Sequence, residues 1–363
     1  MPNDSKDEPL PVKRVFSEIP ADGDEKRYQL ITNFGQFIKH FGEIQKGNSD
    51  LANAVSGFFA NGGSRCYVIR VSAAADNIPG DEFTNALVEF ERVDEIAIVA
   101  APGITEKTKQ EAILTHCNAT GDRFGILDGN PAFDVDDPSG IKNGVGATDR
   151  GAIYYPYIQV ANRHRDFADG DPKRLFVPPS GHVAGIYARV DAERGVHKAP
   201  ANEVVLGAVG LQRLVSHNEQ SNLNDPEGIN VIRDFSGNIR VWGARTIGGE
   251  GADGETYINV RRLLLFLAES IDQSTAFAVF EPNSPPLWSK ITRTVNAFLT
   301  NVWRDGALFG NTPEQAFFVK CDEETNPPEV RDLGQVITEI GVAPVKPAEF
   351  VIFRISQDTN GQE

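Results

Sequence analysis

The amino-terminal half of the chain alternates helical patterns with short apolar runs. Apolar residues at helical spacing fill LANAVSGFFA (51–60) after Ser49-Asp50, and two glycines follow, which predicts a capped helix. The run RCYVIRV (65–71) is β-branched and aromatic, as strands are. The alternation continues with a helix at 82–92, a strand at 95–100, a helix capped by Thr105 and a strand at 123–129. Helices that alternate with fully apolar strands predict a mostly parallel sheet covered on both faces.

The remainder of the chain contains two glycine-rich loops. The first (129–151) is typical of a surface loop, and the second (247–255) indicates a domain boundary. Between the two loops we expect strands at 151–160, 229–235 and 239–245 and a capped helix at 178–195. Beyond the second loop we expect helices at 257–271 and 285–306 and strands at 275–282, 316–321, 335–344 and 349–355.

These elements predict an α/β protein of two domains, which suits a length of 363 residues. Residues 1–246 are expected to form a mixed, mostly parallel sheet core with helices on both faces. Residues 247–363 are expected to form a smaller α+β domain. Its long helix carries Leu287, Ile291 and other apolar residues down one side, as a helix packed on a core does.

Composition and charge narrow the classes of function. A net charge of −16 argues against generic nucleic-acid binding, because a duplex-binding surface needs a dense cationic patch. The start, MPNDSKDEPLPVKRVF, is acidic where a secretory signal is basic and then apolar. The most apolar helix is interrupted by Glu269, so no membrane-spanning segment is expected. These features predict synthesis and assembly in the cytoplasm, with no insertion into a membrane.

No motif for metal binding emerges. Cys66, Cys117 and Cys321 lie far apart beside apolar runs and are expected to be buried free thiols. The acidic group Asp134-x-Asp136-Asp137 lacks the glycine and glutamate that a calcium loop has at its sixth and twelfth places, which favours a solvated turn. The histidines show no H-E-x-x-H pattern and no close pairing with a cysteine; they are His40, His116, His164, His182, His197 and His217.

The sequence also contains no complete motif for nucleotide binding or catalysis. Gly249, Gly251 and Gly254 match a dinucleotide fingerprint as a string, but Glu250, Asp253 and Glu255 in the same loop would repel a phosphate. Neither a G-x-x-x-x-G-K-[ST] loop nor a G-x-S-x-G elbow occurs. No catalytic residue, metal or cofactor is therefore expected.

An enzyme nevertheless remains an alternative, because single residues can converge in space. Its site would be a cleft near Ser180, His182 and Arg189.

The end of the chain, EFVIFRI, is strongly strand-prone and is followed by a polar tail. One interpretation is an edge strand folded on its own domain. The other is a strand donated to a neighbouring chain, because an exposed sheet edge offers main-chain hydrogen bonds to any added strand.

Nine segments together carry a family resemblance. They are FGQFIKHFG, LANAVSGFFANGGSRCYVIRV, VDEIAIVAAPG, VPPSGHVAGIYARVDAERGVHKAPANEVVLGAVGL, NDPEGINVIRDFSGNIRVWGART, YINVRRLLLFLAESI, FEPNSPPLWSKITRTVNAFLTNVWRDGALFG, AFFVKCD and EIGVAPVKPAEFVIFRI. As a set they resemble the contractile tail sheath protein of phage tails and phage tail-like contractile injection systems. The resemblance extends from Phe34 to Ile355, and runs of this length are highly specific.

The resemblance implies a structural subunit that stacks as hexameric rings around an inner tube and contracts to drive the tube through a target envelope. The carboxy-terminal domain would face the tube and the amino-terminal domain would lie outside. The implied partners are further copies of the chain, the inner tube protein, the baseplate and other sheath paralogues. The particle would be cytoplasmic, membrane-anchored or released.

In the family, terminal arms exchange strands between subunits. On this sequence the carboxy-terminal arm corresponds to Glu349, Phe350, Val351, Ile352, Phe353, Arg354 and Ile355. The usual amino-terminal arm, similar to P-G-V-Y-V-E-E, is not found, which leaves strand exchange through the amino terminus open and favours a shorter sheath variant. A baseplate or tail-terminator component of the same machine is the alternative.

Two basic residues are candidates for contact with the tube. Lys290 and Arg293 lie three positions apart on the long carboxy-terminal helix and therefore share a face. Their charge opposes the acidic total of the chain. The other interpretation is an ordinary solvated helix face.

Overall fold

A computed structural model describes residues 28–71, 80–248 and 255–349. Its centre is a six-stranded sheet with the order β3-β4-β5-β10-β11-β8. The strands are β3 (Ile98–Ala100), β4 (Phe124–Asp128), β5 (Gly151–Tyr155), β10 (Ile229–Phe235), β11 (Asn238–Trp242) and β8 (Glu203–Val204). The first four are parallel, β11 runs antiparallel to β10, and β8 at the edge of the sheet runs antiparallel to β11. The predicted α/β fold with a mixed, mostly parallel sheet is confirmed.

Helices cover both faces of this sheet. Successive side chains of a strand point to opposite faces, and here both sets are apolar, so both faces must be buried. Ile153 and Tyr155 of β5 pack toward one cluster, and Ala152 and Tyr154 pack toward the other. The first cluster is closed by α3 (Gly80–Phe90), α4 (Lys107–Thr120), α5 (Pro138–Ile141) and α7 (His217–Asn224). The second cluster is closed mainly by α6 (Ser180–Arg194).

An amino-terminal unit packs on the outer side of α6. It contains β1 (Gln29–Ile31), α1 (Phe34–Phe41), a short 3₁₀ turn (Lys46–Asn48), α2 (Ser49–Ala60) and β2 (Cys66–Val68). The predicted helix is present, but Ser49 is its first residue, and the N-cap is Asn48, whose side chain makes no cap bond. Thr105 likewise lies ahead of the cap of α4, which is Glu106.

The segment expected to be one strand at 151–160 is two strands. β5 ends at Tyr155, the bond to Pro156 is cis, and β6 (Ile158–Ala161) turns into a separate sheet with β7 (Arg174–Val177) and β9 (Gly210–Leu211). Proline lacks the N–H that a ladder needs, which is why a strand breaks there. The first glycine-rich loop contains the short helix α5.

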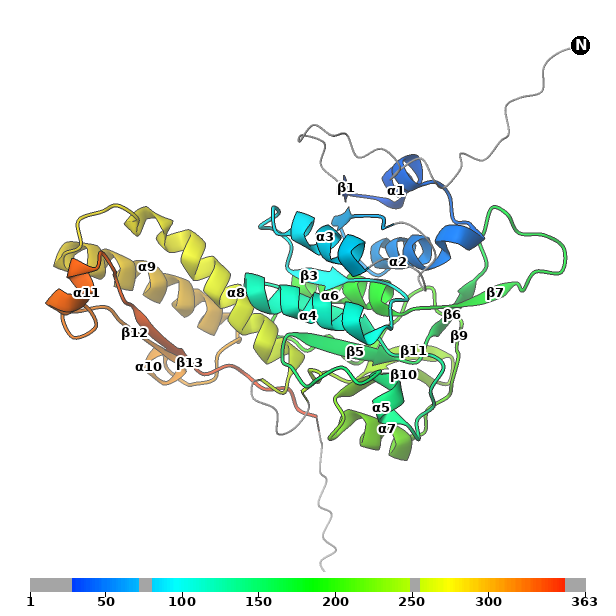
Figure 1. The fold of residues 1–363 in the computed structure, drawn as a ribbon. Helices are drawn as coiled ribbons and strands as arrows, with labels where there is room; N and C mark the ends of the chain where they lie inside the picture. The colour runs from blue at the N-terminus through cyan, green and yellow to red at the C-terminus, as the bar shows by residue number, and fades with distance from the viewer. Residues whose placement is uncertain (1–27, 72–79, 249–254, 350–363) are drawn as a thin grey trace, which may run out of the picture.

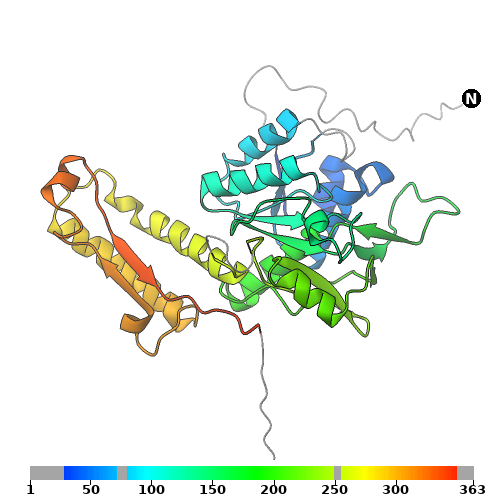
Figure 2. The same cartoon turned by 60° about the horizontal axis from the view of Figure 1, so that its bottom comes forward.

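The carboxy-terminal part is a helical hairpin with a small sheet against it. Its elements are α8 (Ile258–Thr275), a 3₁₀ turn (Ala276–Ala278), α9 (Pro285–Arg304), α10 (Pro313–Ala316), β12 (Phe317–Lys320), α11 (Pro328–Asp332) and β13 (Glu339–Val342). It has its own apolar cluster, including Trp288, Val295 and Leu299. Both views show the hairpin projecting away from the large sheet (Figures 1 and 2).

The strand predicted at 275–282 is wrong. α8 continues to Thr275, and the residues after it turn toward α9. Val279 and Phe280 are largely exposed at this turn, and no strand of the described residues lies beside them to supply hydrogen bonds. A short apolar run alone does not distinguish a strand from a helix end.

Several sequence features lie outside the described residues. These are the amino-terminal 27 residues, the three glycines Gly249, Gly251 and Gly254, and the arm residues Phe350 to Ile355. Cys117 and Cys321 are buried free thiols as expected, whereas Cys66 is only half-buried. Among the described residues, none of the helices combines the length and apolar character that crossing a bilayer requires.

Candidate interaction surfaces

Two of the three residues named for the enzyme alternative, Ser180 and His182, are packed inside the protein. Ser180 is fully buried and donates its hydroxyl hydrogen bond to Asp128 Oδ2 at 2.7 Å. Asp128 also accepts from the backbone N–H groups of Ser180 and Gly103. Burial nevertheless raises the pKa of the Asp128 carboxyl to about 6. The His182 ring lies against Gly57 of α2, and burial lowers its pKa to about 4.

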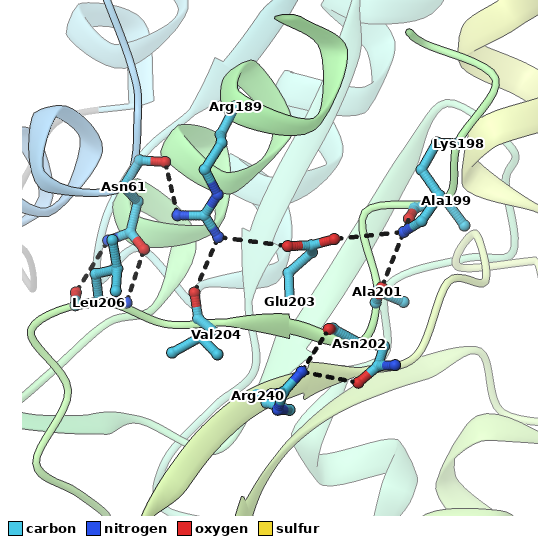
Figure 3. A network of polar contacts seen from close by, with 10 residues as sticks. All are labelled: Asn61, Arg189, Lys198, Ala199, Ala201, Asn202, Glu203, Val204, Leu206 and Arg240. Atoms are coloured by element: carbon cyan, nitrogen blue, oxygen red, sulfur yellow. Dashed lines mark hydrogen bonds and ion pairs between the residues drawn. The ribbon is translucent and has the colours of Figure 1, made fainter. Parts of the chain in front are cut away.

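Arg189, the third residue of that interpretation, serves the fold (Figure 3). Its guanidinium donates to the carbonyl oxygens of Asn61 at 3.1 Å and Val204 at 3.0 Å. The Glu203 carboxylate lies 3.6 Å away. Asn61 in turn exchanges two hydrogen bonds with the backbone of Leu206. This network joins the end of α2 to the segment around β8, so the arginine is occupied structurally.

The acidic group in the first glycine-rich loop also has structural partners. Asp134 pairs with Arg213 at 2.5 Å, and the Asp137 side chain accepts from the Gly140 N–H and caps α5. Within the ranges that the structure describes, no group of three histidine, cysteine or acidic residues could hold a metal ion.

The two predicted tube-facing residues lie on the exposed side of α9. Leu287, Ile291 and Val295 are buried on the opposite side, so the helix presents Lys290 and Arg293 outward. The Lys290 ammonium lies 3.9 Å from the ring centre of Phe277. The Arg293 side chain is exposed as well.

The small sheet of the hairpin has unpaired edges. β12 and β13 pair antiparallel from Phe317 with Val342 to Lys320 with Glu339, and no other described strand pairs with either. Phe318 on β12 is 57% exposed. A two-stranded sheet is marginal alone and gains stability from further strands. This edge is therefore suited to accept a strand.

Glu349, the first residue of the predicted arm, is held by a buried arginine. Nε of Arg245 donates to Glu349 Oε1 at 3.0 Å and Nη2 donates to Oε2 at 2.8 Å. Nη1 of the same guanidinium lies 2.8 Å from the Asp225 carboxylate. Asn224 and Tyr257 also donate to the Glu349 carboxylate. We call these five residues the arm clamp.

The arm clamp favours the charged forms of Glu349 and Arg245. Burial alone would raise the pKa of Glu349, but hydrogen bonds from Arg245 and Asn224 hold it below its ordinary value. Arg245 is 3% exposed and lies between two carboxylates, and these raise its pKa against the effect of burial. Charge-assisted, bidentate pairs of this kind are among the stronger hydrogen bonds in proteins.

The sequence did not single out the partners of Glu349. Asn224, Asp225, Arg245 and Tyr257 are separated from it by up to 125 residues and match no motif. The one sequence feature that hints at a buried ion pair is Arg245, which lies between an apolar strand and a glycine-rich loop in VWGART.

Comparison with known families accounts for the chain from residue 76 to residue 358, apart from a short gap before residue 255. Residues 76–247 match the phage tail sheath protein central domain, and residues 255–358 match the phage tail sheath C-terminal domain. The chain belongs to the phage tail sheath family. Membership of this family points to a structural role.

Similar proteins come from contractile systems. The PVC sheath complex of an extracellular contractile injection system, in the contracted state, is 29% identical with a TM-score of 0.78, covering 96% of this chain and 90% of that one. A chain of the anti-feeding prophage baseplate, 6-fold symmetrised, is 30% identical with a TM-score of 0.76, covering 92% and 88%.

The tail sheath protein of Vibrio phage KVP40 is 27% identical over 263 residues, which are 72% of this chain. The match spans only 36% of that relative's length.

Proposed function

We propose that this protein is the subunit of a contractile sheath that polymerises as stacked hexameric rings around an inner tube. The sheath contracts and drives the tube through a target envelope. The observation that carries the proposal is the likeness to a contracted sheath complex over 96% of the chain. The proposed role needs neither catalysis nor a cofactor. The partners are further copies of the chain, the tube protein, the baseplate and other sheath paralogues.

The arrangement of the subunit follows from the same proposal. Residues 1–246 lie on the outside of the sheath and residues 247–363 face the tube. The strand at Glu349 to Ile355 is donated to a neighbouring subunit, and the unpaired edges of β12 and β13 are the acceptor within the described fold. Assembly takes place in the cytoplasm.

Negative-stain electron microscopy of the purified full chain tests the function. A sheath subunit forms long striated tubes with six-fold end views. A baseplate or terminator component, which the baseplate match also allows, forms single rings. Discrete particles that never polymerise at high concentration would refute both structural roles.

Charge reversal on α9 tests the contact with the tube. Replacing Lys290→Glu together with Arg293→Glu is expected to lower co-assembly with the tube protein by about tenfold or more, because opposite charges accelerate and orient association. Co-sedimentation of sheath and tube measures the effect, and circular dichroism checks the fold. The paired control Lys39→Glu with Arg163→Glu changes two exposed cations of the amino-terminal domain. If both double variants lose the same amount of co-assembly with the tube protein, α9 is not the tube-facing surface.

A further inference from the structure

The chain enters and leaves the helical hairpin at one point. Arg245 and Tyr257 form an antiparallel bridge just before α8, flanked by hydrogen bonds from Thr246 N–H to Thr256 and from Ile258 N–H to Ala244. The Tyr257 hydroxyl then donates to the Glu349 carboxylate at 3.1 Å. The first residue of the arm is thus fixed beside the residue that precedes the hairpin.

This point is fixed in turn to the large sheet. The backbone N–H of Arg245 donates to Asn230 Oδ1 at 2.8 Å, and Asn230 Nδ2 donates to the carbonyl of Arg245 at 2.7 Å. Asn230 is fully buried on β10, a strand in the interior of the six-stranded sheet. A continuous path of short contacts therefore runs from Glu349 through Arg245 to the centre of the sheet domain.

The connection from Glu349 back to the hairpin is weaker. Residues 343–345 are held by neutral hydrogen bonds. Three are backbone bonds, from Phe309 N–H to Ala343, from Ala343 N–H to Ala316 and from Val345 N–H to Ala307, and the fourth runs from Asn259 Nδ2 to the Val345 carbonyl at 3.2 Å. These residues are only half-buried. A pull that lifts a strand away from its partner at one end breaks such bonds one after another, so an unanchored arm drawn away from β12 would peel β13 from it.

We infer that the arm clamp anchors the carboxy-terminal arm to the sheet domain, so that tension on the arm bypasses the helical hairpin. Arg245 is the positioning residue: its guanidinium takes the pull on Glu349 and passes it to β10. The inference rests on the proposed function, because tension requires an arm held by a neighbouring subunit. Its consequence is that β12 and β13 stay paired while the sheath shortens.

The test compares Glu349→Gln with Glu324→Gln in the full chain. The first removes the charge that Arg245 holds at nearly constant shape, and the second removes an exposed carboxylate that pairs with Lys320 inside the hairpin. Sheaths are contracted with mild urea, and hydrogen exchange of the backbone amides at 339–343 and at Val345 is measured in free subunits and in contracted sheaths.

We expect E349Q to exchange these amides at least tenfold faster than the wild type in the contracted sheath, with less than a twofold difference in free subunits. E324Q should match the wild type in both states. Equal exchange rates of these amides in E349Q and wild-type contracted sheaths would overturn the anchor. In that case the pair of Glu349 with Arg245 would carry no tension.

A milder variant covers the case in which E349Q does not assemble. Asn224→Ala removes one hydrogen bond to Glu349 and keeps the arginine pair. It should shift the exchange in contracted sheaths in the same direction by about twofold to threefold, and no shift would again overturn the anchor. If the wild-type chain itself forms no sheath, the proposed function fails, which is a different outcome from a sheath with an unresponsive clamp.

Discussion

A chain that ends at Glu349 is expected to fold normally and to lose polymerisation. It keeps the carboxylate that Arg245 binds, so the arm clamp and all described elements are retained. It loses the strand-prone segment from Phe350 to Ile355. A donated strand of six residues brings about three or four main-chain hydrogen bonds worth ~1 kcal/mol each, so the critical concentration should rise by a factor of about 10² to 10³. Sedimentation over a concentration series, with electron microscopy of the pellets, measures it.

The matched control is a chain that ends at Ile355. It removes only the polar tail SQDTNGQE and should polymerise like the full chain. Thermal unfolding should give the same midpoint for all three proteins, since none of the described core is altered. Striated tubes from the chain that ends at Glu349, at the wild-type critical concentration, would show that the terminal strand is not donated between subunits.

The sheet core could be predicted because the strands β3, β4 and β5 are almost wholly apolar. All five residues of β4 and of β5 are buried, and the helices between the strands carry their own apolar faces. A sequence of this kind has few ways to hide its apolar surface other than a covered parallel sheet. The break at Pro156 also has a local cause, but the run GAIYYPYIQV looked continuous by composition alone.

The contacts of the candidate surfaces could not be predicted, because they join distant residues. Glu349 and Arg245 are 104 positions apart, and neither has a signature that pairs it with the other. The enzyme alternative has the same origin, because the sequence does not reveal that its residues are buried. Ser180 and His182 are polar residues at the start of a helix, and only the packing of α2 against α6 reveals that they are enclosed.

Gly185→Ala is expected to destabilise the protein, although alanine favours helices. α2 and α6 cross so closely that a Cβ atom at Gly185 would lie 2.4 Å from the carbonyl oxygen of Phe58 and 2.8 Å from Asn61 Cβ. The conflict is with backbone, so α2 must move away and loosen the contacts that Asn61 makes around Arg189. Overpacking of this kind costs about 1–3 kcal/mol or more, against a helix-propensity gain of about 1 kcal/mol.

The comparison that isolates this crossing is a series of three variants measured by urea unfolding. Gly80→Ala, at the start of α3, adds a Cβ with nothing within 4 Å and should be neutral or slightly stabilising. Gly185→Val should cost more than Gly185→Ala, because its extra methyl groups also meet α2. If Gly185→Ala and Gly80→Ala unfold at the same urea concentration, α2 and α6 can move apart to admit the added Cβ atom without loss of stability. The amino-terminal unit would then not depend on this glycine for its position on the sheet domain.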